Sequence, residues 1–326
     1  MSLSLSEKTE KKAKGKREHN KKENDFLYDI KHNKFLLLMV LPGVLFFIVF
    51  SYLPMLGIVI AFQDFSAAKG ILRSRFVGFE NFKFFLGSKD SFRVTFNTLF
   101  LNCLFIFTSI AASIGIAIML SEVSRKWFKK VSQSIVILPH FISWTVIALL
   151  AEALFSSDAG FINHTVTSIG LKPIPFYKDA SIWPGLLTLM NIWQGAGFGS
   201  IVYLAAITGI DQEIFEAAKI DGASRIQAIR YITLPLLKST AILLLIMAVG
   251  KIFNGNFGMI YSLVGTNTLL YPTTDIIDTY VYRQLMELGD LGMSSAVGLY
   301  QSVLGFVMVL ITNKIASKIS PESAVF

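Results

Sequence analysis

Long runs of uncharged, mostly apolar residues constrain this chain more than any other feature. A helix needs roughly 20 apolar residues to cross a membrane. Six runs reach that length: Phe35–Gln63, Thr95–Ser121, Val131–Ala151, Ala180–Ile210, Ser239–Thr274 and Leu291–Asn313. Lys251 is their one Lys, Arg, Asp or Glu. Because a helix satisfies its own backbone hydrogen bonds in lipid, the runs predict an all-α integral membrane protein with six transmembrane helices.

Composition agrees with a membrane protein and argues against a soluble domain. The 326 residues are 53% hydrophobic and 16% charged, whereas soluble domains carry about 25% charged residues. The first run is too long for a signal peptide and follows about 34 mostly polar residues. The single cysteine, Cys103, lies inside the second run and excludes an internal disulfide.

Lysine and arginine residues predict the orientation, because cytoplasmic loops are enriched in them. The tail 1–34 carries ten, Glu122–Lys130 carries four and Asp211–Lys238 carries four. Phe155–Asp179 has two, and the loop between the last two runs has only Arg283. The loop after the first run breaks the pattern with six, but longer loops follow the rule less strictly. Both termini are therefore expected in the cytoplasm.

The net charge of +8 arises largely from this asymmetry. A basic tail can bind nucleic acid, but a solvated tail facing the lipid headgroups is favoured, and no nucleic-acid partner is expected. The alternating Lys and Glu residues predict disorder up to about Asn24.

The connector 211–238 is rich in polar and small residues and contains one glycine, Gly222. Asp211 is placed to cap a helix through Lys219, and Gly222 supplies the tight turn that ends this helix. Ser224 and Gln227 form the capping box of a second short helix, which Pro235 is expected to end before the fifth span. An amphipathic helix of this kind fits a groove in a partner protein, although an ordinary cytoplasmic hairpin has similar weight on physical grounds. A DNA-reading helix-turn-helix is disfavoured, because two spans tether the segment.

The same connector resembles the EAA signature of binding-protein-dependent ABC importer permeases. The matching residues are Glu216, Ala217, Ala218, Asp221, Gly222, Ala223, Ile232, Leu234 and Pro235. Ile229 stands where the family often has an aromatic residue. Residues 138–144, 209–211 and 278–283 resemble the polysaccharide, or aldouronate-type, carbohydrate branch, and the similarity covers about 35–316.

The resemblance implies a fold, partners and a location. The fold is the type I ABC importer transmembrane domain (35–316), with a basic tail (1–34), a short cytoplasmic tail (317–326) and the EAA loop (211–238) as coupling helix. The partners are a second similar permease, two cytoplasmic ATPase subunits and an extracellular or periplasmic sugar-binding protein, in a bacterial cytoplasmic membrane. The coupling residues are then Glu216, Ala217, Ala218, Asp221, Gly222, Ala223, Arg225, Leu234 and Pro235.

Polar residues within the runs are candidates for an oligosaccharide pathway, since such groups usually face the protein interior or water. They are Asn191, Trp193, Gln194, Lys251, Asn254, Asn256, Tyr261, Tyr300 and Gln301. The competing interpretation is helix-to-helix hydrogen bonding, with Gly195, Gly197 and Gly199 as close-packing surfaces. On an unbroken helix, Lys251, Asn254 and Tyr261 would share one side. Lys251 either meets an acidic sugar or pairs with Glu152 or with the second permease.

Other functional classes find less support. The chain has no GxxxxGK[ST] phosphate loop, so ATP hydrolysis is expected in its partners, and the chain itself is not expected to be an enzyme. No catalytic constellation, metal-ligand spacing or cofactor motif is present. The alternative is a secondary transporter or channel for small polar solutes. A secondary transporter would need intramembrane acids for ion coupling, and Glu152 is the only candidate.

Overall fold

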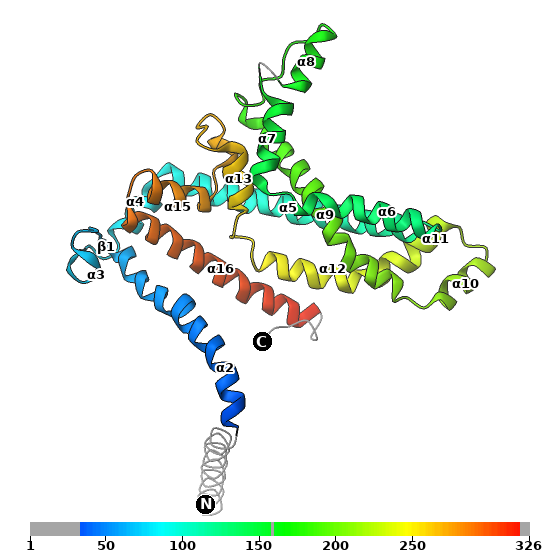
Figure 1. The fold of residues 1–326 in the computed structure, drawn as a ribbon, viewed down its shortest axis with the longest axis horizontal. Coiled ribbons are helices and arrows are strands. Elements are labelled where there is room, and N and C mark those ends of the chain that lie inside the picture. The colour runs from blue at the N-terminus through cyan, green and yellow to red at the C-terminus, as the bar shows by residue number, and fades with distance from the viewer. Residues whose placement is uncertain (1–32, 158–159, 320–326) are drawn as a thin grey trace, which may run out of the picture. The chain divides into compact units, whose positions relative to one another are not determined.

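The computed structural model describes residues 33–157 and 160–319, which are mostly helical (Figure 1). The chain divides into two compact units, residues 1–59 and 60–326. The predicted disordered tail up to Asn24 and most of the C-terminal tail lie outside the described residues.

The first unit is the start of one long apolar helix. It comprises α2 (Lys34–Phe47), the π-helical turn η1 (Ile48–Tyr52) and the first part of the 3-10 helix η2 (Leu53–Phe62). None of the residues in α2 or η1 is buried.

The second unit holds the other elements. A two-residue antiparallel ladder pairs β1 (Gln63–Asp64) with β2 (Arg75–Phe76). The helices up to the middle of the chain are α3 (Gly70–Arg73), α4 (Glu80–Gly87), α5 (Lys89–Ser121), α6 (Lys126–Ile137), η3 (Leu138–Phe141), α7 (Trp144–Phe155) and α8 (Phe161–Ser168). After these come η4 (Ala180–Ile182), α9 (Trp183–Thr208), α10 (Gln212–Ile220), α11 (Arg225–Ala228), η5 (Ile229–Thr233), α12 (Leu234–Val249), α13 (Phe257–Val264), α14 (Tyr271–Thr274), α15 (Ile277–Met286) and α16 (Leu291–Ile319).

The pair α5 and α9 forms the centre of the second unit (Figure 1). Small residues allow this close packing: a Cβ on Gly199 would lie 2.6 Å from the Ser113 hydroxyl of α5, and one on Gly197 would overlap the Val136 carbonyl of α6. The prediction that Gly197 and Gly199 are close-packing surfaces is confirmed, whereas Gly195 has open space around it. Such contacts stabilise helix pairs in lipid, where apolar burial gives little driving force.

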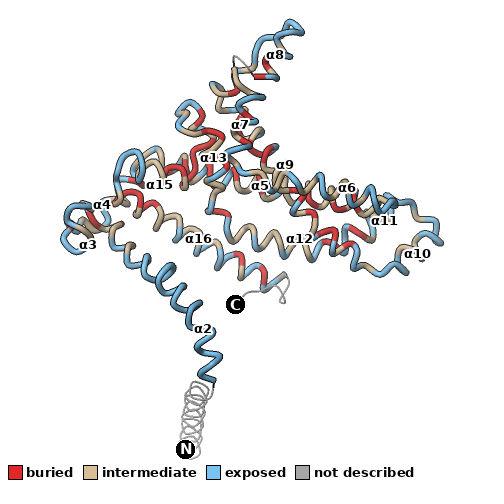
Figure 2. The backbone as a smooth tube through the Cα atoms, in the orientation of Figure 1, coloured by how far each residue is buried: buried red, intermediate tan, exposed pale blue. Residues whose placement is uncertain are grey.

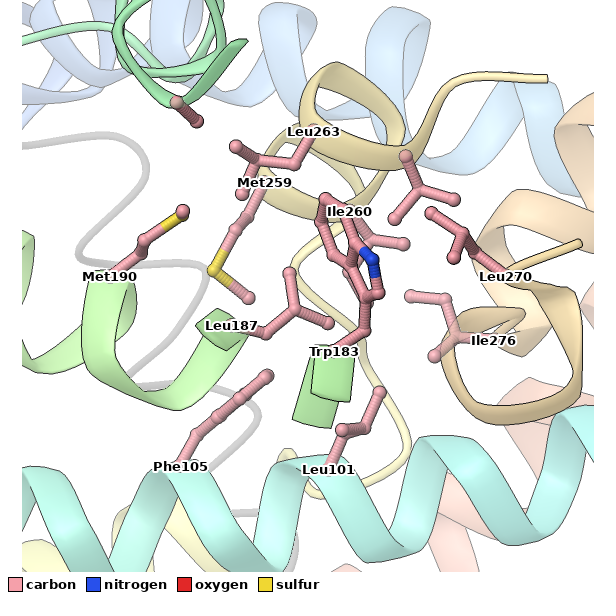
Figure 3. Packing of buried hydrophobic residues seen from close by; sticks show 12 residues of the cluster. Leu101, Phe105, Trp183, Leu187, Met190, Met259, Ile260, Leu263, Leu270 and Ile276 are labelled. Atoms are coloured by element: carbon pink, nitrogen blue, oxygen red, sulfur yellow. The ribbon is translucent and has the colours of Figure 1, made fainter. Parts of the chain in front are cut away.

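Three clusters of buried side chains hold the second unit together. Figure 2 marks the buried residues along the backbone, and Figure 3 shows the first cluster. One joins α5, α7, α9 and α13 around Trp183 and Met259, whose side chains lie between the two long helices and the shorter α13. Another joins α4, α5, α15 and α16 around Phe85 and Ile277. The last joins α5, α9 and α12 around Tyr203.

Four helices in the described ranges are long and apolar enough to cross a membrane: Lys34–Phe62, Lys89–Ser121, Arg225–Val249 and Leu291–Lys318. A fifth arises if the pair Lys126–Phe141 and Trp144–Phe155, bent by 96°, counts as one span. The bend falls where Ile142 and Ser143 are extended and Ser143 caps α7. The helix α9 is not among these spans, because its glycines, Asn191 and Gln194 lower its hydropathy.

For two of the six runs, the prediction of one continuous helix is therefore wrong. The third run is broken by the bend before α7. The fifth run ends as a helix at Val249 and continues, after an irregular stretch 250–256, as the short helices α13 and α14.

Candidate functional sites

The EAA segment folds as a helical hairpin, as the sequence predicts. Asp211 caps α10 by accepting a hydrogen bond from the Glu213 N–H at 3.0 Å. Gly222 follows the helix with φ of +80°, the left-handed conformation that glycine adopts without steric cost. Ser224 and Gln227 then form a capping box, with bonds of 3.3 and 2.7 Å. Each of these local predictions is confirmed.

The expected end of the second helix at Pro235 is wrong. The helix passes from α11 through the π-helical turn η5 into α12, and Pro235 lies in the first turn of α12. The wide turn accommodates the proline because the Leu234 N–H bonds the Ile229 carbonyl, five residues back. The same arrangement occurs in the first unit, where the Leu53 N–H bonds the Ile48 carbonyl just before Pro54. At these two positions a π turn precedes the Leu-Pro pair, and the helix continues.

The hairpin presents a mixed surface at one end of the second unit (Figure 1). Of the predicted coupling residues, Glu216, Ala217, Asp221, Gly222, Arg225, Leu234 and Pro235 are exposed, and Ala218 and Ala223 are half-buried. A hollow of about 320 Å³ lies in the hairpin, lined by both alanines, Asp221 and Gly222.

Three large apolar side chains of this surface escaped sequence reasoning. Ile220 is 86% exposed, Ile226 76% and Tyr231 68%. Their position as large apolar residues in a mostly polar connector was the available signal.

Most of the predicted pathway residues make hydrogen bonds inside the second unit. Asn191 on α9 donates to the Ser109 hydroxyl on α5 at 2.9 Å, and Gln194 donates to the His140 carbonyl at 3.3 Å. This favours the competing interpretation for these two, helix-to-helix hydrogen bonding. Trp193 between them is 46% exposed.

The remaining candidates have varied surroundings. Asn256 caps α13, accepting from the Met259 N–H at 3.1 Å. Tyr261 stacks on Phe257. The Tyr300 hydroxyl shares a 3.2 Å hydrogen bond with that of Thr95.

Lys251 and Asn254 do not occupy the helical face that the sequence predicts. Both lie in the irregular stretch 250–256, so a period of 3.6 residues does not relate them to Tyr261 on α13. In this stretch Gly255 passes so close to Ile276 that a Cβ at Gly255 would overlap its side chain, and Asn256 starts a new helix. Lys251 and Asn254 are exposed. No ion pair joins Lys251 to Glu152 or to another carboxylate in the described part of the chain.

A larger hollow, of about 730 Å³, lies between α7, α13 and the segment before α9. Its lining includes Glu152 and Lys178, together with the phenol rings of Tyr177 and Tyr261. Of the predicted pathway residues, only Tyr261 reaches it.

A buried carboxylate network secures α15. The Asp275 side chain is fully buried, accepts two hydrogen bonds from Arg283 and one from Arg93, and also receives the Thr279 hydroxyl. Asp278 accepts from the Gly255 N–H at 2.9 Å and from Gln301 at 3.1 Å. Burial raises the pKa of the Asp278 carboxyl, and these two hydrogen bonds oppose the shift only in part. Of these residues, the sequence indicated Asp278, Thr279 and Arg283 only as part of a family resemblance, and Gln301 only as a pathway candidate.

Comparison with known proteins identifies the class to which this fold belongs. The chain matches the family of binding-protein-dependent transport system inner membrane components over residues 109–321. It is 39% identical to protein LplB of Bacillus subtilis, over 90% of this chain and 92% of that one. It is 37% identical to the polygalacturonan/rhamnogalacturonan transport system permease protein YteP of the same organism, over 92% and 93%.

Solved structures agree. A chain of a bacterial ABC transporter involved in the import of the acidic polysaccharide alginate superposes with a TM-score of 0.82 at 34% identity, covering 90% of this chain and 99% of that chain. A chain of the alginate transporter in complex with an alginate pentasaccharide-bound periplasmic protein gives 0.80. The protein belongs to the family of inner membrane components of binding-protein-dependent ABC importers. It is a multi-pass membrane permease, and the alternative of a secondary transporter or channel has no support among its relatives.

Proposed function

We propose that this chain is one of two permease subunits that together form the pathway of an ABC importer for oligosaccharides. Residues 35–316 form its transmembrane domain, with six spans: the four long helices, the bent pair and α9. Support for counting α9 comes from its 26 residues and its extensive packing against α5. The distribution of basic residues supports a cytoplasmic location for both termini and for the loop 211–238.

The observation that carries the coupling role is the shape of the EAA hairpin. It joins an exposed helix, a left-handed Gly222 turn and exposed Ile220 and Ile226, at one end of the second unit. An apolar patch on a short helix fits a groove in a partner protein. The partner is a cytoplasmic ATPase subunit, two of which drive the cycle. Each permease contributes one hairpin, so a second, similar permease pairs with this one.

The proposed substrate is an oligosaccharide delivered by a sugar-binding protein outside the membrane. The relative YteP is described as a polygalacturonan and rhamnogalacturonan permease, and the solved neighbour imports alginate with a periplasmic protein. Trp193 offers an exposed aromatic face for a sugar ring, and Asn254 an exposed amide.

Affinity purification tests the assembly. The tagged chain, co-expressed with the permease, ATPase and binding-protein genes of its own locus, should copurify with one other permease and two ATPase subunits, as measured by native mass spectrometry. A complex containing two copies of this chain and no second permease would refute the heterodimer. Loss of the ATPase alone from a complex carrying Ile220→Asp and Ile226→Asp would support the hairpin as its docking element. The matched control is Leu288→Asp, an exposed apolar residue after α15 and far from the hairpin in the sequence.

A further inference from the structure

The loop after the first apolar run carries six basic residues on the side that the other loops assign to the outside. Topology does not account for them, because lysine and arginine are enriched in cytoplasmic loops. The structure folds the first part of this loop into a hairpin, in which β1 and β2 pair around the short helix α3. We call residues 63–79 the outer hairpin.

Side-chain hydrogen bonds fix the turn of the outer hairpin. The buried Ser74 hydroxyl donates to the Gly70 carbonyl at 2.7 Å and accepts from the Ser66 N–H at 3.1 Å. The buried Gln63 amide donates to the Ile71 carbonyl at 2.9 Å. Gly70 takes the left-handed conformation, with φ of +69°, that the turn requires. The hairpin therefore presents its outward side chains in a fixed arrangement.

The first turn of α16 sets the depth of the outer hairpin in the membrane. A Cβ at Gly292 would lie 2.7 Å from the Gln63 carbonyl, and β1, α3 and α4 gather near the start of α16 (Figure 1). The uncharged part of α16, Leu291–Asn313, measures about 34 Å at 1.5 Å per residue. Because this length is close to the ~30 Å hydrocarbon core, the outer hairpin lies where the acyl chains meet the headgroups.

An aromatic cluster joins the outer hairpin to Phe62, the last residue of the first span. The Phe62 ring stacks on Phe76, with centroids 6.5 Å apart, and meets Phe79 edge to face at 5.4 Å. Phe82 of α4 contacts both Phe62 and Phe79. Phe76 is nevertheless 69% exposed and Phe79 66%. Their free faces extend the apolar surface of a membrane span past its last residue.

Unpaired basic residues surround the most exposed apolar side chain of the outer hairpin. Leu72 in α3 is 99% exposed, so nothing in the described part of the chain covers it. Lys69 and Arg73 are exposed and lie one helical turn apart. Neither forms an ion pair with a carboxylate among the described residues. Arg75 differs from them, because the ladder places it opposite Asp64.

Lipid satisfies this combination of groups better than a water-soluble partner does. Apolar side chains at this depth insert between the headgroups and the acyl chains, as those of interfacial helices do. Lysine and arginine side chains reach from there to the headgroups, where phosphate oxygens accept charge-assisted hydrogen bonds. An acidic sugar would satisfy Lys69 and Arg73 but would leave Leu72, Phe76 and Phe79 uncovered.

We propose that the outer hairpin is a binding site for an anionic phospholipid of the outer leaflet. Lys69 and Arg73 bind the headgroup, and Leu72, Phe76 and Phe79 contact its acyl chains. The site goes beyond the proposed function, because it concerns the lipid around the permease and not the transported solute.

A fluorescence measurement in vesicles tests the site. Cys103→Ala removes the only cysteine, and Leu72→Cys then carries a fluorophore at the tip of the outer hairpin. The complete importer is placed in mixtures of phosphatidylglycerol and phosphatidylcholine, in which the acyl chains of one lipid or the other are brominated and quench a nearby fluorophore. We expect quenching by both lipids, and stronger quenching by brominated phosphatidylglycerol.

The matched label is Ile169→Cys in the same background. Ile169 is 67% exposed in the loop between α7 and α9, on the same side of the membrane, and lies fourteen residues from either helix. Neither brominated lipid should quench a fluorophore there.

Lys69→Gln combined with Arg73→Gln should abolish the preference for phosphatidylglycerol and leave quenching by both lipids. Each basic residue near a membrane surface favours anionic lipid about fivefold, so the two together predict a preference of roughly 30-fold, measured by titrating one lipid against the other. Lys314→Gln combined with Lys318→Gln removes two exposed bases at the other end of α16. This charge-matched control should keep the preference.

Three results would overturn the proposal. No quenching of the Leu72→Cys label by either lipid would show that water or protein surrounds the outer hairpin. Equal quenching by the two lipids, with both bases intact, would show that the hairpin touches lipid without selecting an anionic headgroup. Quenching of the isolated chain that disappears in the complete importer would assign this surface to a protein partner.

Discussion

Arg283 holds the buried Asp275 carboxylate with two parallel hydrogen bonds, Nη1 to Oδ1 at 3.2 Å and Nη2 to Oδ2 at 2.8 Å. The guanidinium also lies over the Tyr271 ring, 4.5 Å from its centroid. Arg93 adds a third bond from α5 at 3.1 Å. Asp275, which follows α14, is therefore joined to α15 through Arg283 and to the start of α5 through Arg93. We assign these helix ends to the outer side of the membrane.

Replacing Arg283 should destabilise the protein, and alanine should do so more than lysine. Arg283→Ala removes two bonds to a fully buried carboxylate, and breaking such a pair typically costs about 3–5 kcal/mol, reduced here because Arg93 remains. Arg283→Lys should recover only part of this, since an ammonium cannot form both bonds in parallel. Thermal unfolding of the purified chain in detergent checks the order Arg283→Ala, Arg283→Lys, unmodified. Equal melting temperatures would show that the pair contributes nothing.

Asp278 predicts a dependence of stability on pH. Its folded-state pKa lies above the ordinary value of 3.8, chiefly because of burial. A carboxyl group with a raised folded pKa favours the fold when protonated, so this contribution is present at low pH and lost as pH rises through the folded pKa. Asp278→Asn keeps an oxygen that can accept from Gly255 and Gln301 without the charge. We expect the variant to melt above the unmodified protein at neutral pH, with the difference vanishing at acidic pH. A difference independent of pH would contradict this.

Gly222 should be required for coupling and not for folding. Its φ of +80° is strained for other residues by about 1–2 kcal/mol, but a Cβ there would meet no atom within 4 Å. Gly222→Val should thus insert into the membrane normally and lose substrate-stimulated ATP hydrolysis by the assembled importer. Gly222→Asn is the matched variant, since asparagine tolerates the left-handed region, and it should keep most of the activity. Normal uptake by the valine variant would refute the coupling role of the hairpin.

Gly197 and Gly195 make a matched pair for helix packing. A Cβ at Gly197 would overlap the Val136 carbonyl of α6, whereas one at Gly195 would meet nothing within 4 Å. Gly197→Ala should therefore lower stability by about 1–3 kcal/mol, as overpacking does. Gly195→Ala should be neutral or slightly stabilising, because alanine favours the helix. Unfolding in detergent measures both, and equal effects would show that α6 and α9 adjust freely.

Local patterns in the sequence predicted more of this structure than the long apolar runs did. Each local prediction depends on contacts between residues at most four positions apart. These predictions are the caps made by Asp211, Ser224 and Gln227 and the turn at Gly222, and all are confirmed. The break after Val249 depends instead on distant groups: Ile276 against Gly255, and the amides of Asn102 and Gln301. The periodicity of the run contains no information about such distant contacts. The helical face that it predicts for Lys251 is therefore wrong, because Lys251 lies outside both helices.

Pro235 shows a further reason why local rules fail. A proline inside a helix usually breaks it, because it lacks the backbone N–H and its ring clashes with the carbonyl four residues back. Here the wider π turn before Pro235 accommodates both effects. Whether a helix ends at a proline or continues past it after a π turn depends on the packing of the helix that follows. Leu237 of α12 is buried against α5 and α9, which favours continuation. The pathway residues Asn191 and Gln194 were ambiguous for the same reason, since a polar group in a span reveals its partner only in three dimensions.

Uptake by reconstituted vesicles tests the central claim most directly. The vesicles contain this chain, the second permease and the ATPase, with ATP inside and the sugar-loaded binding protein outside. We predict oligosaccharide accumulation that requires internal ATP and the binding protein, and that disappears when either permease is omitted. Accumulation without ATP, driven by an ion gradient or by the sugar gradient alone, would contradict the account of this chain as an ABC importer permease.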